Sequence, residues 1–313
     1  MNLIDVNRKF TNDAECLAYL EAQRWASGVR CVTCGGDRIS RITRQKKTKN
    51  LRGNLYQCLE KTCNQQFTST SGTIFHDSHL TLTQWFTAVA LICDAKKSLS
   101  ALQLQRHLGI GSYRTAWYLA HRIRKAMEET EESRMATPLT GTIEADETYI
   151  GGKYDKRRKR GPYEKPGVMG MLERGGKVRT YQIPTASKDV LVGTIRNNTD
   201  MEARIMTDES TAYKSLGTLR KHDSVAHSKL EWVRGDVHTN GIENYWSLLK
   251  RGVVGSFHQI SKKYLDLYMM EFEYRFNNRK TPELFVQTIG RMCQTGVMEL
   301  KALKADKPSA FGL

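Results

Sequence analysis

Three acidic residues lie in or beside short predicted elements, at positions where their carboxylates could share one reaction centre. Asp146 lies within a predicted strand, Asp208 ends a second strand, and Glu243 lies in the first turn of a predicted helix. Enzymes that transfer phosphoryl groups use such carboxylates to hold two divalent ions about 3.5–4 Å apart. Oxygen ligands favour Mg2+ or Mn2+ over zinc. The three acids therefore predict phosphodiester chemistry with two such ions in each active site.

The residues beside these acids are spaced so that some of them share a face. Glu144 precedes Asp146 by two positions, which places both on one face of the strand. Lys250 follows Glu243 by seven positions and lies two turns further along the same helix face. Taken singly, each acid would more often be a surface or capping residue. The prediction of a metal site therefore depends on the whole set.

Four cysteines form two closely spaced pairs, Cys31-x2-Cys34 and Cys58-x4-Cys63. Tetrahedral zinc takes four soft ligands, and each short pair can wrap a tight turn so that both thiolates face one ion. Gly35-Gly36 permits the sharp turn after the first pair. The spacing predicts a zinc ribbon with one structural Zn2+, and the alternative is four free buried cysteines. The other three cysteines are expected to be packing residues.

Two basic segments could contact phosphate groups. Residues 41–52, between the cysteine pairs, carry six cations, among them Arg41, Arg44, Lys46 and Lys47, and no acid. The second segment is the run of five cations over 156–160, which includes Arg157 and Arg158. On a ribbon, the first would form a basic hairpin suited to DNA phosphates, and the second could clamp DNA. The alternative for both is a solvated loop.

The segment 98–125 has the pattern of a helix-turn-helix. Gly109 interrupts the helical pattern, Ile110 could fill the turn, and Ser112 could cap the second helix. An apolar stripe runs along one side of that helix. The other side carries cations, including Arg114 and Arg122, which are the residues that a recognition helix needs to reach bases and phosphates.

The composition agrees with a nucleic-acid partner. The 313 residues include 49 Lys and Arg against 33 Asp and Glu, a net charge of +16, and 39% are hydrophobic. This apolar content excludes a wholly disordered chain, and the positive charge indicates a polyanionic partner. No apolar run approaches the ~18 residues of a membrane span, and the N-terminus lacks an apolar signal region. We therefore expect no membrane partner and a cytoplasmic protein whose cysteines stay reduced.

The order of predicted elements suggests a multidomain protein of the α+β or α/β class. Strands are expected over 142–150, 168–172, 178–183 and 204–208, and helices over 240–251 and 262–278, so a mixed sheet covered by helices should form. An acidic stretch and Pro138 mark the main boundary, near 133–141. The predicted domains are an N-terminal helix (1–28), the zinc ribbon (29–76), the helix-turn-helix module (77–132), a catalytic domain (141–280) and a helical tail (281–313).

Several longer motifs resemble those of one known family. They are Glu144-Ala-Asp146-Glu147-Thr-Tyr149-Ile-Gly151-Gly152-Lys153, Val237-His238-Thr239-Asn240-x-x-Glu243-x-x-Trp246-Ser-x-x-Lys250-Arg251, Gly255-Ser-Phe-His258-x-Ile-Ser261-Lys262-Lys263-Tyr264 and Glu271-Phe272-x-x-Arg275-x-Asn277-x-Arg279. With the ribbon and helix-turn-helix ahead of them, they resemble a DDE-type transposase of a bacterial insertion sequence, in the Merlin-related group. The resemblance covers roughly residues 10–280. It implies a ribonuclease-H-like catalytic domain.

The resemblance also implies roles for individual residues. Asp146 and Asp208 would be the first two metal ligands. The third would be Glu243 or Asn240, because family members carry either Glu or Asn before the basic pair. The spacing to Lys250 and the charge of a carboxylate favour Glu243. Asn240 would then be a cap or a group behind the ligands, and His238 a supporting group or a DNA contact.

The implied activity is DNA transposition. The N-terminal modules would bind the terminal inverted repeats, and the catalytic domain would cleave the 3′ ends and join them to target DNA. Lys250 would complete the catalytic set and, with Arg251, hold DNA phosphate near the metals. Joining two ends in one event implies at least a homodimer on double-stranded DNA, in a bacterial nucleoid. The alternatives are a catalytically silent DNA-binding regulator and a nuclease that degrades RNA–DNA hybrids.

Overall fold

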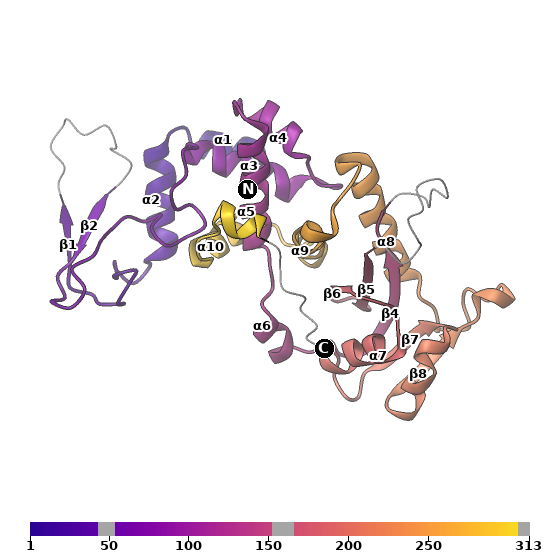
Figure 1. Cartoon of the computed structure of the whole chain (residues 1–313). Helices are drawn as coiled ribbons and strands as arrows, with labels where there is room; N and C mark the ends of the chain where they lie inside the picture. Colours follow the sequence, from indigo (N-terminus) through magenta and orange to yellow (C-terminus); the bar gives the residue numbers. More distant parts are fainter. Residues whose placement is uncertain (43–53, 152–165, 306–313) are drawn as a thin grey trace. The chain divides into compact units, whose positions relative to one another are not determined.

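The chain folds into two compact units in a computed structural model that describes residues 1–42, 54–151 and 166–305 (Figure 1). The N-terminal unit comprises Met1–Met127 together with Thr281–Leu313, and the sheet unit comprises Glu128–Lys280. Residues 281–305 therefore pack with the N-terminal residues.

A small three-stranded sheet forms the ribbon of the N-terminal unit. Its antiparallel order is β1 (Ile39–Ile42), β2 (Leu55–Cys58) and β3 (Gln66–Phe67). Trp25, Tyr56 and Phe67 pack together beside the sheet, with ring centroids 5.5–5.9 Å apart. Glu21 on helix α2 (Asp13–Arg24) accepts hydrogen bonds from Asn54 and Tyr56, which ties the ribbon to that helix.

Helices make up the rest of the N-terminal unit. They are α1 (Leu3–Lys9), α2, α3 (Leu82–Asp94), α4 (Ala101–His107), α5 (Tyr113–Ala126), α10 (Leu284–Gln294) and α11 (Leu300–Lys304). Asn12 caps α2, and Thr81 and Ser100 form capping boxes at α3 and α4, because each side chain accepts an orphan N–H of the first turn. α10 packs against α2, α3 and α5 (Figure 1).

The turn between α4 and α5 follows the predicted pattern, but one predicted DNA contact on α5 lies inside the unit. Gly109 adopts a φ of +61°, and Ile110 is buried beneath the turn. Arg122 is only 3% exposed. Its guanidinium donates to the His76 carbonyl at 2.7 Å and lies 5.0 Å from the centre of the Trp85 ring. We therefore remove Arg122 from the set of predicted DNA contacts.

A five-stranded mixed sheet forms the centre of the sheet unit, in the order β6-β5-β4-β7-β8. The strands are β4 (Thr142–Tyr149), β5 (Gly167–Glu173), β6 (Val178–Ile183), β7 (Arg204–Asp208) and β8 (Lys221–Val225). β4, β5 and β6 pair antiparallel, whereas β7 and β8 continue parallel to β4. The helices are α6 (Glu131–Ala136), α7 (Lys188–Asn198), α8 (Asn240–Gly252) and α9 (Leu265–Asn277). Shorter helical turns span Thr211–Thr218, His227–Lys229, Val253–Phe257 and Lys262–Tyr264.

Helices cover both faces of this sheet. One hydrophobic cluster joins Ala145 and Ile205 of the sheet to residues of α7 and to Tyr213. A second cluster joins Val168 and Leu172 of β5 to residues of α8 and α9. Because side chains alternate along a strand, Asp146 and Glu144 point toward the α8 face. The predicted mixed sheet covered by helices is thereby confirmed.

The pairing of β4 with β7 brings two of the predicted acids together. Thr142 pairs with Arg204 and Glu144 with Met206, an offset of 62 residues. Asp146 and Asp208 each lie two residues beyond the last of these pairs, on the two neighbouring strands. In addition, none of the helices in the described part of the chain is long and apolar enough to cross a membrane.

The different positions of two arginines on α5 give a testable prediction. Arg122→Ala should lower the free energy of unfolding by about 2–4 kcal/mol, because it removes a buried stem and leaves the His76 carbonyl unpaired. Arg114→Ala, at an exposed position of the same helix, should change it by less than about 0.5 kcal/mol. Urea unfolding measures both. Equal effects of the two substitutions would contradict the buried placement of Arg122.

Candidate active site

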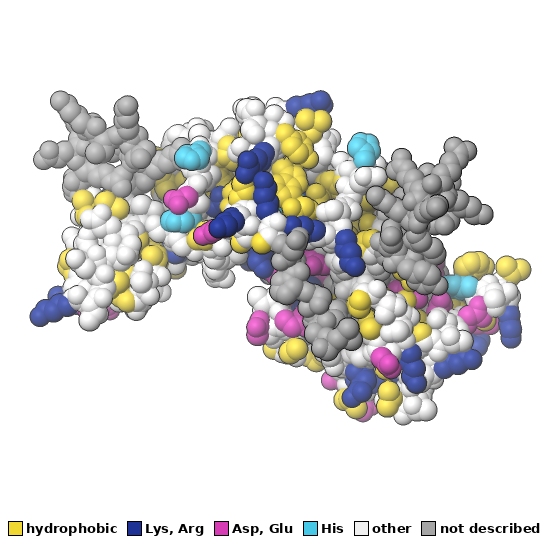
Figure 2. Space-filling view, in the orientation of Figure 1, with side chains coloured by type: hydrophobic (Ala, Val, Ile, Leu, Met, Phe, Trp, Pro, Cys, Tyr) yellow, Lys and Arg dark blue, Asp and Glu magenta, His cyan; other side chains and the backbone are white. Residues whose placement is uncertain are grey.

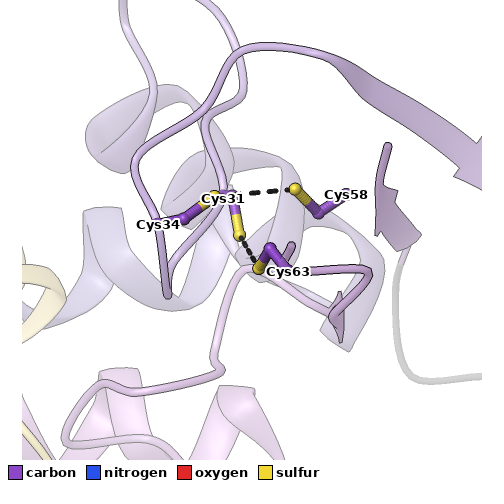
Figure 3. A group of neighbouring side chains, drawn as sticks. All are labelled: Cys31, Cys34, Cys58 and Cys63. Atoms are coloured by element: carbon purple, nitrogen blue, oxygen red, sulfur yellow. Dashed lines mark hydrogen bonds between the residues drawn. The ribbon is translucent and has the colours of Figure 1, made fainter. Parts of the chain in front are cut away.

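The four predicted zinc ligands come together at one end of the ribbon (Figure 3). The Sγ atoms of Cys31 and Cys63 lie 3.6 Å apart, and those of Cys34 and Cys58 lie 3.7 Å apart. All four sulfur atoms lie within 4.8 Å of one another. Tetrahedral zinc with bonds of about 2.3 Å separates its sulfur ligands by about 3.8 Å. This donor set is compatible with a structural zinc ion.

Tight turns present these thiols, as the spacing predicted. The Gly35 N–H donates to the Cys31 carbonyl at 3.0 Å, with Gly35 at a φ of +75°, a conformation that favours glycine. Burial opposes ionisation of the Cys31 thiol. Hydrogen bonds from the backbone N–H groups of Cys34 and Thr33 nevertheless lower its pKa to about 6. Burial and neighbouring thiols raise the pKa values of Cys58 and Cys63, so the thiolate, which is the species that binds zinc, forms most readily at Cys31.

Asp146 is half-buried on β4, where α8 covers the sheet. Its Oδ2 accepts a hydrogen bond of 2.9 Å from the Trp246 indole N–H. Gly170 is the residue opposite Asp146 on β5. A Cβ atom there would lie only 2.4 Å from the Trp246 ring. Glycine at this position therefore lets the indole reach the carboxylate, a role for both residues that the sequence reading did not include.

The environment of Asp146 disfavours its charged form. Burial is the main cause, and the negative charges of Glu147 and Asp208 add to it, so the pKa of Asp146 rises to about 7. Like charges near a partly desolvated carboxylate raise its pKa, whereas a divalent cation would lower it. Asp146 therefore lies in surroundings that suit a bound cation.

Glu147 is a further acid at this position that the sequence reading left without a role. It points to the opposite face of the sheet and accepts a hydrogen bond from the Tyr213 hydroxyl. Burial raises the pKa of Glu147, as does the nearby Asp208. The only sequence signal was its place beside Asp146.

The other two predicted acids lie at the edges of their elements. Asp208 ends β7 and accepts the Ser210 N–H at 3.0 Å, which fixes the turn after the strand. Glu243, with 41% of its side chain exposed, accepts the Thr239 hydroxyl at 2.7 Å. Its Oε1 also lies 3.8 Å from the His227 Nε2.

Glu144 attaches the helix that carries Glu243 to the strand that carries Asp146. Its buried Oε2 accepts the N–H groups of Gly241 and Ile242 at 2.6 and 3.0 Å. Its Oε1 accepts the Arg174 Nε at 2.8 Å and lies 3.2 Å from the His238 Nδ1. A carboxylate is favourable at a helix N-terminus, where unpaired N–H groups and the helix dipole face it.

The remaining predicted residues of this region take distinct positions. Asn240 is the first residue of α8 and is exposed, and Thr239 holds the cap position that was predicted for Asn240. The His238 carbonyl accepts a hydrogen bond from Arg174, whose guanidinium also donates to Glu144. Lys250 and Arg251 are exposed in the last turn of α8.

The acids differ from the cysteines in how closely they gather. Among the described residues, the four cysteines are the one group whose metal-ligand atoms all lie within 4.8 Å of one another. The carboxylates of Asp146, Asp208 and Glu243 are therefore more widely spread than a group that shares one ion. Their oxygen donors and the raised pKa of Asp146 nevertheless fit a hard divalent cation.

Of the predicted DNA contacts in the N-terminal unit, Arg41 on β1 and Arg114 on α5 are exposed. Arg41 also donates to the Asn54 side chain. The predicted contacts at Arg44, Lys46, Lys47, Arg157 and Arg158 lie outside the described residues.

The cysteine geometry predicts a zinc content. The purified chain should carry one zinc ion, Cys58→Ser should lose it, and Cys16→Ala, which alters a buried cysteine outside the cluster, should keep it. Because binding of a structural zinc contributes directly to folding, Cys58→Ser should also melt at a lower temperature. A chromogenic chelator measures the metal released. Retention of a full equivalent by Cys58→Ser would contradict the assignment.

The raised pKa of Asp146 predicts a pH-dependent stability without added divalent cation. Between about pH 4 and 7 the folded wild type holds a proton that the unfolded chain has released, so its free energy of unfolding falls as the pH rises. Asp146→Asn cannot titrate, and its advantage should grow across this window to about 1–4 kcal/mol. Thermal unfolding from pH 4 to 8 measures this, with the exposed Asp189→Asn as control. A difference from wild type that is the same at every pH would contradict it.

Two parts of the chain match family models of transposases. Residues 138–277 match an ISXO2-like transposase domain, and residues 11–66 match a transposase zinc-ribbon domain. A protein of the transposable element ISH50 from Halobacterium salinarum is 26% identical over 287 residues, which cover 86% of this chain and 92% of that protein. A transposase-like protein from Haemophilus influenzae is 31% identical over 103 residues, covering 33% of this chain and 82% of that protein. No solved structure matches the chain. Both matched domains and these relatives lead to one conclusion, that the chain belongs to the IS1595 family of insertion-sequence transposases.

Proposed function

We propose that this family member cleaves the 3′ ends of its element and joins them to target DNA. The observation that carries the proposal is the placement of Asp146 and Asp208 on adjacent parallel strands, each two residues beyond the last paired residues, beside the helix that carries Glu243. The strand order, three antiparallel strands extended on the other side by two parallel ones, supports a ribonuclease-H-like fold.

Asp146, Asp208 and Glu243 would hold Mg2+ or Mn2+. When bound, these ions supply Lewis acidity for the attacking oxygen and charge stabilisation for the leaving oxygen. Trp246 orients the Asp146 carboxylate through its indole N–H, and Glu144 holds the N-terminus of α8. These contacts hold the helix that carries Glu243 against the strand that carries Asp146.

DNA contacts are proposed on both units. Tyr113 and Arg114 are exposed at the N-terminus of α5, which is the part of a recognition helix that contacts base edges. The buried Ile110 beneath the turn from α4 to α5 supports a helix-turn-helix. Arg41 would contact phosphate from the ribbon, and Lys250 and Arg251 would do so near the acids. Two ends must be joined, so at least two chains would assemble on the DNA.

Asp146→Asn tests the catalytic assignment. It should slow end cleavage in Mg2+ by about 10^3-fold or more, because loss of a metal ligand removes several kcal/mol of transition-state stabilisation. Binding of the same DNA should be unchanged, and Asp189→Asn should cleave normally. The substrate is a labelled duplex from the DNA that flanks the coding region, with a target plasmid and, separately, a labelled RNA–DNA hybrid.

The products separate the alternatives. Labelled DNA joined to the plasmid supports the proposal. Binding without cleavage would indicate a silent regulator, and cleavage of the hybrid alone would indicate a hybrid nuclease. Undiminished cleavage by Asp146→Asn would show that the site is elsewhere.

A further inference from the structure

The loop from residue 226 to 237, between β8 and α8, exposes large apolar side chains. Leu230 is 79% exposed, Trp232 53% and Val233 50%. Of the five tryptophans in the chain, all within the described residues, Trp232 is the one with more than half of its surface exposed. The segment projects outward from the sheet (Figure 1), and hydrophobic side chains are visible at its end in Figure 2. Exposed apolar groups gathered in this way mark interaction sites.

Hydrogen bonds hold this loop in one shape. Glu209, the residue after Asp208, accepts both the backbone N–H and the hydroxyl of Ser228 at 2.8 Å. Arg234 and Val237 exchange two backbone hydrogen bonds of 3.0 Å, and the Arg234 guanidinium donates to the Ser224 carbonyl at 2.9 Å. Leu230 adopts a φ of +60°, which is rare for a branched apolar residue. The apolar side chains are thus presented from a fixed scaffold.

The exposed indole is connected to the acids by one side chain. The rings of Trp232 and His227 have centroids 4.6 Å apart and planes 30° apart. The His227 Nε2 lies 3.8 Å from the Glu243 Oε1. The imidazole therefore lies between the indole and Glu243. A group stacked on Trp232 would lie close to any DNA phosphate that reaches the acids.

Two cations lie close to the exposed indole in the sequence. Lys229 and Arg234 are exposed on either side of the apolar residues, and Glu231 lies 3.6 Å from Arg234. A flat aromatic ring flanked by cations is the arrangement that proteins use to stack an unpaired base while holding its phosphates.

From these observations we propose that Trp232 stacks on an unpaired DNA base beside the cleavage site. The proposal rests on the proposed function, because it requires DNA at the acids. An extruded base on Trp232 would fix the position of the strand relative to Asp146 and Asp208. Opening a base pair near the reacting phosphate requires unstacking, and an aromatic platform offsets part of that cost.

The test measures DNA binding without divalent cation, so that cleavage does not enter the result. The zinc-loaded full chain is titrated into two short duplexes, one blunt and one with a single unpaired 2-aminopurine at the 3′ end. Wild type should prefer the unpaired base by about 5- to 150-fold and quench its fluorescence. Trp232→Ala should lose the preference and the quenching while it binds the blunt duplex as wild type does. Trp232→Phe should keep much of both.

Met201→Ala is the matched control, since Met201 is 70% exposed in the turn that precedes β7, at the other end of that strand from Asp208. It should bind as wild type does. An undiminished preference in Trp232→Ala would overturn the proposal. So would a change in sedimentation of Trp232→Ala without loss of the preference, which would indicate a second copy of the chain as the partner. Wild-type binding to both duplexes with equal affinity would overturn the stacking alone, whereas no DNA binding at all would also contradict the proposed function.

Discussion

The attachment of α8 to β4 through Glu144 is the interaction on which the proposed catalytic site depends. Burying a carboxylate is costly unless its oxygens are paired. Glu144 has two helix N–H groups on one oxygen and Arg174 on the other. The same Arg174 donates to the carbonyls of Asp236 and His238, the residues that lead into α8. One partly buried ion pair thus fixes both the start of the helix and its approach to the sheet.

Close packing around this attachment requires two glycines. A Cβ at Gly241 would lie 2.6 Å from Leu172 and 2.8 Å from the Glu144 carboxylate, so any side chain there would push α8 off the strand. Gly170 likewise leaves room for Trp246, whose ring occupies the space that a side chain opposite Asp146 would fill. The two glycines let backbone and indole approach the sheet closely enough for charge-assisted hydrogen bonds to form.

The sequence predicted those features that have a local or periodic signal. The cysteine spacing, the strand around Asp146 and the helix that starts near Glu243 are of this kind, and the structure confirms each. Strand β8 could not be recognised in the sequence, because Lys221, His222 and Asp223 lack the apolar alternation of a strand. Arg122 was predicted to be exposed because periodicity identifies the apolar side of a helix and places Arg122 on the other side. It does not show that Trp85 and the His76 carbonyl also cover the polar side.

The contacts that orient the acids could not be predicted, because each joins residues far apart in the chain. Trp246 and Asp146 are 100 positions apart, and Glu144 and Gly241 are 97. Their meeting depends on the sheet register and on the helix that lies across it. The same contacts explain how the chain tolerates the neighbouring acids Asp146, Glu147 and Asp208, whose charges repel. Burial raises the pKa of Asp146, so its carboxyl can stay protonated. Glu144, Arg174 and Trp246 meanwhile hold the surrounding backbone in place. A site arranged in this way is less stable alone than with a cation, which couples metal binding to the stability of the sheet.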